Sequence, residues 1–135
     1  MSLIVKRPVI LKTIVTEKFK QELIQQLSEA IKQIEVKLEQ MEFQMRRTIA
    51  ELEKTDPKRA RLVKEELMAE KRRQEQIKLS LQRKLEEVEK LEIGSEFITG
   101  TYDAPVKIEV GDDIRQKLSQ AEIIVKDGIV ISIKE

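Results

Sequence analysis

The chain contains no cysteine and no histidine among its 135 residues. These absences exclude disulfide bonds, thiol catalysis, imidazole acid–base catalysis and the usual zinc ligands. Aromatic residues make up only 3% of the chain, so there is little material to line a concave catalytic pocket. We therefore expect a non-enzymatic protein with no catalytic, cofactor-binding or metal-binding residues.

Long apolar runs are also missing. No apolar segment approaches the roughly 20 residues that a membrane-spanning helix needs, and the first residues do not form a signal-peptide pattern. We therefore expect a cytoplasmic protein that makes no membrane contact.

Charged residues, by contrast, supply 38% of the chain, and they are dense between residues 16 and 92. Apolar residues recur there at steps of three and four, which is the spacing of a coiled-coil seam. In the first half they are Ile24, Leu27, Ile31, Ile34, Leu38, Met41 and Met45, and in the second half Val63, Leu67, Ile77, Leu81, Val88 and Leu91. The second seam is interrupted, because its spacing also includes Glu70 and Gln74. The pattern predicts two long helices.

A break at residues 55–57 separates the two helices. Asp56 can cap the second helix, and Pro57 suits a first helical position, where its missing N–H has no cost. Since so short a break joins two matched seams, we expect the helices to fold back as an antiparallel hairpin. Thr16 is expected to cap the first helix.

Both ends of the chain are rich in β-branched residues and predict short strands. The predicted strands cover residues 9–15, 97–102, 106–110, 121–126 and 129–134. Pro8 separates the first strand from a shorter piece at Ile4 and Val5. A turn is expected at residues 103–105, and Asp127-Gly128 is a strong hairpin signal. A short helix from about residue 113 to Ser119 is expected to bury Ile114 and Leu118.

These elements predict an α+β protein in which a helical hairpin is inserted into a small β-domain. Residues 1–15 would supply the first strand, residues 16–92 the antiparallel hairpin with its turn at 55–57, and residues 93–135 the remaining strands. The β-domain would contain about five strands. Whether it closes into a barrel or pairs between chains stays open at this point.

A second apolar stripe lies on the first helix, opposite its seam. Val36, Phe43 and Ala50 are spaced by seven residues and form this outer stripe. It predicts a contact surface for a homo-oligomer or for a helix of a protein partner. The alternative is that these are ordinary isolated apolar residues on a surface.

The predicted hairpin tip is basic. Residues 44–74 carry 10 Lys and Arg against 6 Asp and Glu, a net charge of +4. This excess predicts a contact with RNA, the ribosome or another polyanion. The alternative is a solvated face whose cations pair with neighbouring glutamates. The basic residues proposed for such a contact are Arg46, Arg47, Lys58, Arg59, Arg61, Lys71, Arg72 and Arg73.

Three parts of the chain carry a family resemblance: the opening run Val-Ile-Leu-Lys-Thr-Ile-Val-Thr-Glu-Lys-Phe-Lys at residues 9–20, the helical middle, and the tail from Val110-Gly111-Asp112 to Gly128. Together they resemble the YlqD family of small bacterial proteins. The resemblance implies a cytosolic protein encoded near ribosome-maturation factors in some bacteria, and it supplies no site residue. We expect a non-enzymatic oligomeric scaffold or adaptor that presents a coiled-coil arm. Binding of RNA or the ribosome through the basic tip is the alternative.

Overall fold

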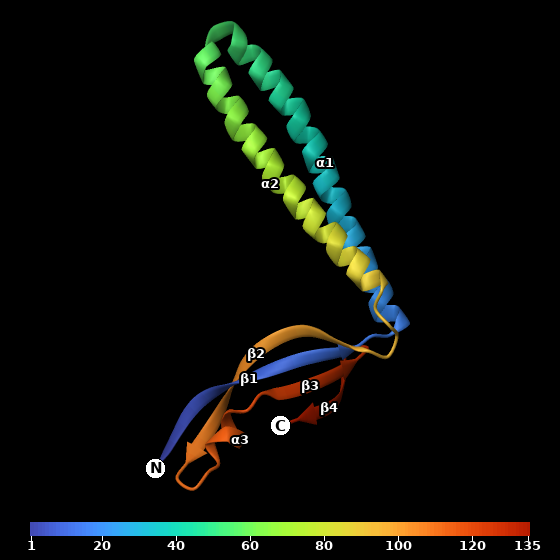
Figure 1. Ribbon diagram of the computed structural model, residues 1–135, viewed down its shortest axis with the longest axis vertical. Helices are drawn as coiled ribbons and strands as arrows, with labels where there is room; N and C mark the ends of the chain where they lie inside the picture. The colour runs from blue at the N-terminus through green and yellow to red at the C-terminus, as the bar shows by residue number, and fades with distance from the viewer. The chain divides into compact units, whose positions relative to one another are not determined.

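The computed structural model of the protein describes residues 1–135 and divides them into two units (Figure 1). Met1–Gln21 and Leu91–Glu135 form a β-sheet unit, and Glu22–Lys90 form a helical unit. The protein is α+β, with three helices and one open mixed sheet of four strands.

The sheet has the strand order β2-β1-β3-β4. β1 (Ser2–Ile14) pairs antiparallel with β2 (Glu96–Glu109) over its whole length, with a bulge beside Leu11. β3 (Ala121–Lys126) runs parallel to β1, and β4 (Ile129–Lys134) returns antiparallel to β3 through the Asp127-Gly128 turn. Both turn residues have positive φ, as the Asp-Gly signal predicts.

The expected five strands and the barrel are corrected by this topology. Residues 97–110 do not contain two strands with a turn, because residues 103–105 continue β2. Pro105 lies opposite Lys6, and Pro8 lies opposite Asp103. Both prolines therefore lie where β1 and β2 pair only with each other. Each strand has a free edge there, so a proline without an N–H does not interrupt hydrogen bonding to a further strand. The sheet stays open because its outer strands, β2 and β4, do not pair.

The core of the sheet unit lies where β1, β2 and β3 meet. Val15 is fully buried, and Val9, Ala121 and Ile124 are nearly so. The rings of Phe19 and Phe97 pack at a centroid distance of 6.0 Å, close to the start of the first helix. Burial of such apolar side chains stabilises the unit by roughly 1.5–3 kcal/mol for each large one.

The short helix α3 (Ile114–Leu118) follows β2 and is capped by Asp113, whose carboxylate accepts a hydrogen bond from the Arg115 backbone N–H at 3.0 Å. The expectation that Ile114 and Leu118 are buried was wrong, since both side chains are exposed. A helix of five residues has little more than one turn, and the side of α3 that carries Ile114 and Leu118 faces solvent.

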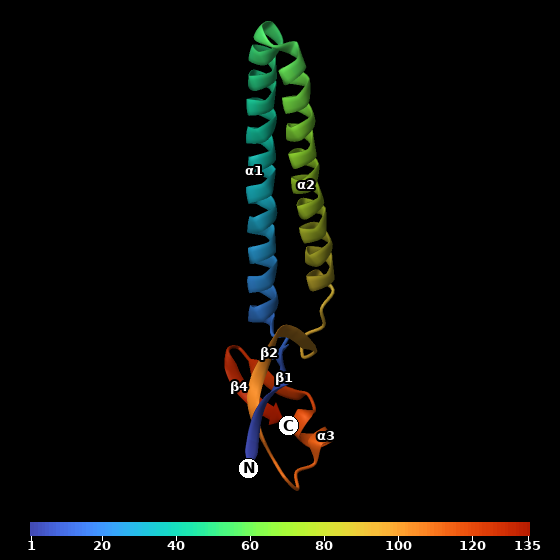
Figure 2. The ribbon, with the colours of Figure 1, turned by 90° about the vertical axis from the view of Figure 1, so that its left-hand side faces the viewer.

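α1 (Glu17–Thr55) and α2 (Pro57–Glu89) run side by side as an antiparallel hairpin (Figure 2), and all of it from Glu22 onward belongs to the helical unit. The two helices are separated by Asp56, whose carboxylate accepts a hydrogen bond from the Arg59 backbone N–H at 3.2 Å. α1 begins after Thr16, whose hydroxyl accepts from the Phe19 N–H at 3.1 Å. Both caps satisfy backbone donors that a helix start leaves free.

The inward side of α2 differs from the predicted seam at one position. Ile77 is exposed, whereas Gln74 and Lys78 are half-buried. The inward-facing residues of α2 therefore run from Gln74 through Lys78 to Leu81. The four-residue step from Gln74 to Lys78 is closer to the helical repeat of 3.6 residues than a three-residue step to Ile77 would be. The middle of α2 consequently turns polar side chains toward α1.

Candidate interaction surfaces

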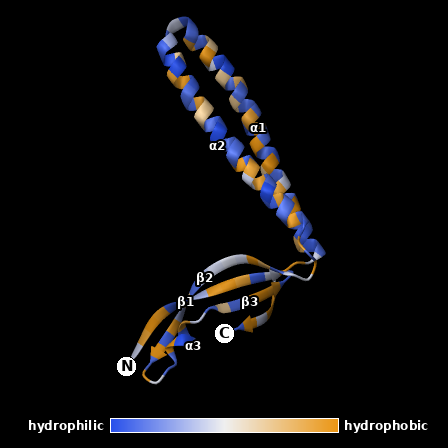
Figure 3. Cartoon of the chain, viewed as in Figure 1, coloured by the Kyte–Doolittle hydropathy of each residue, from blue (hydrophilic) through white to orange (hydrophobic).

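The outer stripe of α1 lies on the solvent side of the hairpin. Phe43 is 69% exposed and Val36 46% exposed, and Ala50 is exposed as well. On the opposite side of α1, Ile31 is buried and Leu38 is half-buried. Figure 3 shows hydrophobic segments recurring along the whole length of this helix. The three stripe residues therefore share a helix face that no other part of the hairpin covers.

The stripe is hollowed at its end nearer the start of α1. A shallow depression of about 340 Å³ is lined by Glu29, Lys32, Gln33 and Val36. Its walls are the aliphatic stems of charged and amide side chains, which can pack against an apolar group while their polar ends stay in water. The depression extends the apolar surface of Val36 by about two helical turns, as far as Glu29.

The second helix also exposes apolar side chains that the sequence did not predict to be exposed. Leu62, Met68, Ile77 and Leu79 are all exposed, and they do not recur at a helical period. Leu62, Met68 and Leu79 carried no periodic signal like that of the outer stripe, and the seam spacing placed Ile77 on the inward side of α2, where it does not lie. They are scattered over α2 and do not form a second stripe.

The middle of the hairpin is polar on one side only. Gln74 donates a hydrogen bond to Glu70 at 3.1 Å, and Lys78 forms an ion pair with Glu35 of α1 at 3.3 Å. The hydrogen bond from Gln74, together with the neighbouring Arg73 guanidinium, lowers the pKa of Glu70. These contacts satisfy the polar groups of α2, but they leave the apolar side of α1 weakly covered.

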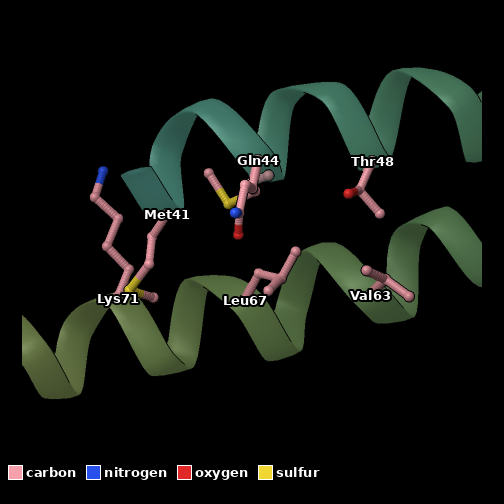
Figure 4. Close-up of a pocket in the computed structure, with 7 residues that line it drawn as sticks. Met41, Gln44, Thr48, Val63, Leu67 and Lys71 are labelled. Atoms are coloured by element: carbon pink, nitrogen blue, oxygen red, sulfur yellow. The ribbon is translucent and has the colours of Figure 1, made fainter. Parts of the chain in front are cut away.

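Nearer the tip, the two helices line a partly open cavity of about 190 Å³ (Figure 4). Its residues come from both helices: Met41, Gln44, Met45, Thr48, Val63, Leu67 and Lys71. Two of these side chains are methionines, which are flexible and fill irregular spaces. The cavity shows that the seam is not closely packed here, and its mainly apolar lining offers no set of converging catalytic groups.

The proposed polyanion contacts differ in how far they are neutralised within the chain. Arg46 pairs with Glu42 at 2.8 Å, Arg47 with Glu51 at 3.8 Å and Lys71 with Glu75 at 4.0 Å, and Arg73 pairs with Glu70. By contrast, no carboxylate lies within ion-pair distance of the remaining four, Lys58, Arg59, Arg61 and Arg72. Three of those four lie in the first turns of α2, at the hairpin tip.

The acidic residues of the sheet unit have local roles. Asp112 accepts a hydrogen bond from the Glu109 N–H at 2.7 Å, and Asp127 accepts from the Thr16 hydroxyl at 2.6 Å. No group of three or more carboxylates lies close enough to hold a metal ion. Neither long helix has an apolar stretch sufficient to cross a bilayer.

Comparison with known proteins gives a consistent result. Residues 3–134 match the family described as YlqD protein. A curated relative, "Uncharacterized protein YlqD" of Bacillus subtilis (strain 168), is 30% identical over 122 residues, which are 90% of this chain and 91% of the relative. A crystal structure of a protein of unknown function from Synechococcus sp. WH 8102 shares the fold, with a TM-score of 0.84, 23% identity, and coverage of 100% of this chain and 96% of that one.

Proposed function

This chain belongs to the YlqD protein family, and we propose that it acts as a non-enzymatic interaction protein, an oligomeric scaffold or adaptor whose helical hairpin presents a contact surface. The observation that carries the proposal is the exposure of Phe43 and Val36 on one uncovered face of α1. A large aromatic side chain held in water on a rigid helix is typical of a residue that becomes buried in a complex.

The weak covering of the hairpin interior supports the same proposal. α1 is apolar on the side that faces α2 as well as on its outer stripe. The middle of α2 places the polar residues Glu70, Gln74 and Lys78 opposite that apolar side. An amphipathic helix from another chain could cover the stripe and stabilise α1 through apolar burial, in the helix-in-groove manner.

The experiment that tests this proposal is Phe43→Glu, followed by solution mass from light scattering. If the outer stripe joins chains, the substitution should lower the oligomer mass, since it places a charge in a surface that must lose water. Leu62→Glu is the matched control, because Leu62 is exposed to a similar extent but lies off the stripe. An unchanged mass for Phe43→Glu would remove the stripe from the assembly.

A second candidate function is binding of structured RNA or the ribosome through the tip. Its support is that Lys58, Arg59 and Arg61 lie close together in α2 without carboxylate partners, so that phosphates could neutralise them. Phe43 is the only aromatic residue in the hairpin beyond Phe19, so stacking on single-stranded bases is not part of this proposal. Light scattering with and without bulk ribosomal RNA, at two salt concentrations, distinguishes the two functions.

A further inference from the structure

The outer edge of β4 carries no proline, and its only charged residue is Lys134 at the end of the strand. β4 pairs with β3 on one side only. Residues 129–133 are uncharged, and four of them are large apolar side chains exposed to 54–68%: Ile129, Val130, Ile131 and Ile133. An edge strand of this composition tends to pair with another strand.

The other free edges of the sheet are protected. β2, the opposite outer strand, carries Asp103, Pro105, Lys107 and Glu109. The part of β1 that β3 does not reach carries Lys6 and Pro8. Charges and prolines at these positions oppose the addition of a further strand. The contrast singles out β4 as the edge that is suited to pairing.

The register of β4 on β3 determines which side chains share a face. Ser132 lies opposite Ile124 and Val130 opposite Val125, so Ile131 is an extra residue without a partner. Ile129 and Ser132 therefore lie on one face of the sheet, and Val130 and Ile133 on the other. When two copies of β4 pair antiparallel, residues directly opposite each other must share a face. Placing Ile129 opposite Ser132 meets this requirement.

That same register also pairs charges at both ends of the strand. It places Asp127 of one copy opposite Lys134 of the other, and the two-fold symmetry of a homodimer repeats the pair. Only one oxygen of the Asp127 carboxylate is used within the chain, in the hydrogen bond from Thr16. A parallel pairing would instead bring like charges together. Charge and facing thus select one antiparallel arrangement.

We propose that the partner of this edge is a second copy of the chain, paired antiparallel through β4 in this register. Two four-stranded sheets then form one sheet of eight strands, whose ends are both the protected β2 edge. Such a dimer is closed, because neither end accepts a third copy. This inference shares with the proposed function only the requirement that the chain forms an oligomer. It assigns the interface between copies to β4 and not to the outer stripe of α1.

The first test is the solution mass of the full chain carrying Ile131→Lys. The pairing places the two introduced lysines beside the two-fold axis, where they repel each other. We expect the mass to fall from twice 15.8 kDa to 15.8 kDa. Ile98→Lys is the control, because Ile98 is similarly exposed but lies in β2; its mass should stay that of the dimer. Circular dichroism verifies that both variants are folded.

The outcomes separate this inference from the proposed function. A dimer that persists in Ile131→Lys but is lost in Phe43→Glu overturns the β4 pairing and leaves the outer stripe as the interface. A dimer lost only in Ile131→Lys supports the β4 pairing. A wild-type chain that is a monomer at every concentration overturns both forms of self-association.

The second test determines the register by disulfide formation. The chain has no native cysteine, so Ile129→Cys and Ser132→Cys each introduce a single thiol. In the proposed register these positions face each other between copies, whereas each lies about 10 Å from its own counterpart, three residues along the strand. Mixed oxidation should cross-link the two variants to each other, and neither should cross-link alone. If either variant alone cross-linked as well as the mixture of the two, the proposed register would be overturned.

Discussion

Lys12 and Glu122 join the two parallel strands of the sheet by an ion pair, in which Nζ of Lys12 lies 2.9 Å from Oε1 of Glu122. Glu96 of β2 lies 3.5 Å from the same ammonium group, so one lysine connects three strands. The hydrogen bond and charge of Lys12 lower the pKa of the Glu122 carboxyl. The hydrogen bond from Lys12 to Glu122 raises the pKa of the lysine in turn, against the opposing effect of desolvation.

The pair should make stability depend on pH at the acidic end. Because the pKa of Glu122 is lower in the folded chain, its contribution is present above the ordinary value of 4.5 and is lost as the pH falls through the lowered value. The raised pKa of Lys12 has the opposite sign, so its contribution is lost only as the pH rises above 10.5. Between these limits the pair is fully effective.

Glu122→Gln tests this relationship. We expect the variant to unfold at a lower urea concentration than the wild type at pH 7, and we expect the difference to shrink at pH 3. Glu109→Gln is the control, because Glu109 forms a pair with Lys107 at an exposed site, where little stabilisation is expected. A difference for Glu122→Gln that is the same at both pH values would show that the carboxylate charge is not responsible.

Much of the fold could be predicted from local patterns. The helix caps at Thr16 and Asp56, and the Asp127-Gly128 turn, depend on residues close in sequence, so their signals are readable without tertiary structure. The continuous course of β2 through Pro105 could not be read in this way. It depends on which edges of β1 and β2 remain free, and that is a property of the assembled sheet.

Gly100 and Tyr102 make a contact between neighbouring residues on one face of β2. A Cβ atom at Gly100 would lie 2.9 Å from Cε2 of the Tyr102 ring, so the ring covers the glycine backbone. We expect Gly100→Ala to displace the exposed tip of the Tyr102 ring and to change the free energy of unfolding by less than about 1 kcal/mol. In a Tyr102→Ala background the same substitution should be neutral or stabilising, because alanine suits a strand better than glycine. Additive effects in this double-mutant cycle would contradict the contact.

The outer stripe could be predicted because its residues follow a heptad spacing. The basic tip could be predicted only in part, since half of its eight cations are neutralised by glutamates. Composition identified eight basic residues, but it could not tell which of them pair with glutamates. Arg46 and Arg73 have carboxylate partners three or four residues away, whereas Arg59 and Arg61 have none within ion-pair distance. The sequence left pairing between chains open, but it could not show that β4 is a free edge, since that follows from the strand order.

The polar middle of α2 leads to a prediction about the stability of the hairpin. Gln74 is half-buried on the side of α2 that turns toward α1, near the hollow that Leu38 lines with Lys71 and Lys78. Gln74→Leu should raise the free energy of unfolding by about 1 kcal/mol, since it adds apolar burial where a polar amide is now held. Gln76→Leu, at an exposed position of the same helix, should have no such effect. Thermal unfolding followed by helical circular dichroism measures both. A loss of stability in Gln74→Leu would show that the hydrogen bond to Glu70 contributes more than apolar contact.

The tip leads to the prediction that separates the two candidate functions. If polyanions bind there, Arg59→Glu combined with Arg61→Glu should abolish the mass increase with bulk ribosomal RNA, because each reversal replaces a phosphate contact with repulsion. Binding by the wild type should also weaken steeply with salt. Arg46→Glu combined with Arg47→Glu is the matched control, because these cations already have glutamate partners; it should reduce binding less. Helical content should stay unchanged in both variants. RNA binding that survives the reversal at Arg59 and Arg61 would exclude the first turns of α2 as the contact, and a wild type that ignores RNA while forming a stable oligomer would leave the scaffold as the function of this chain.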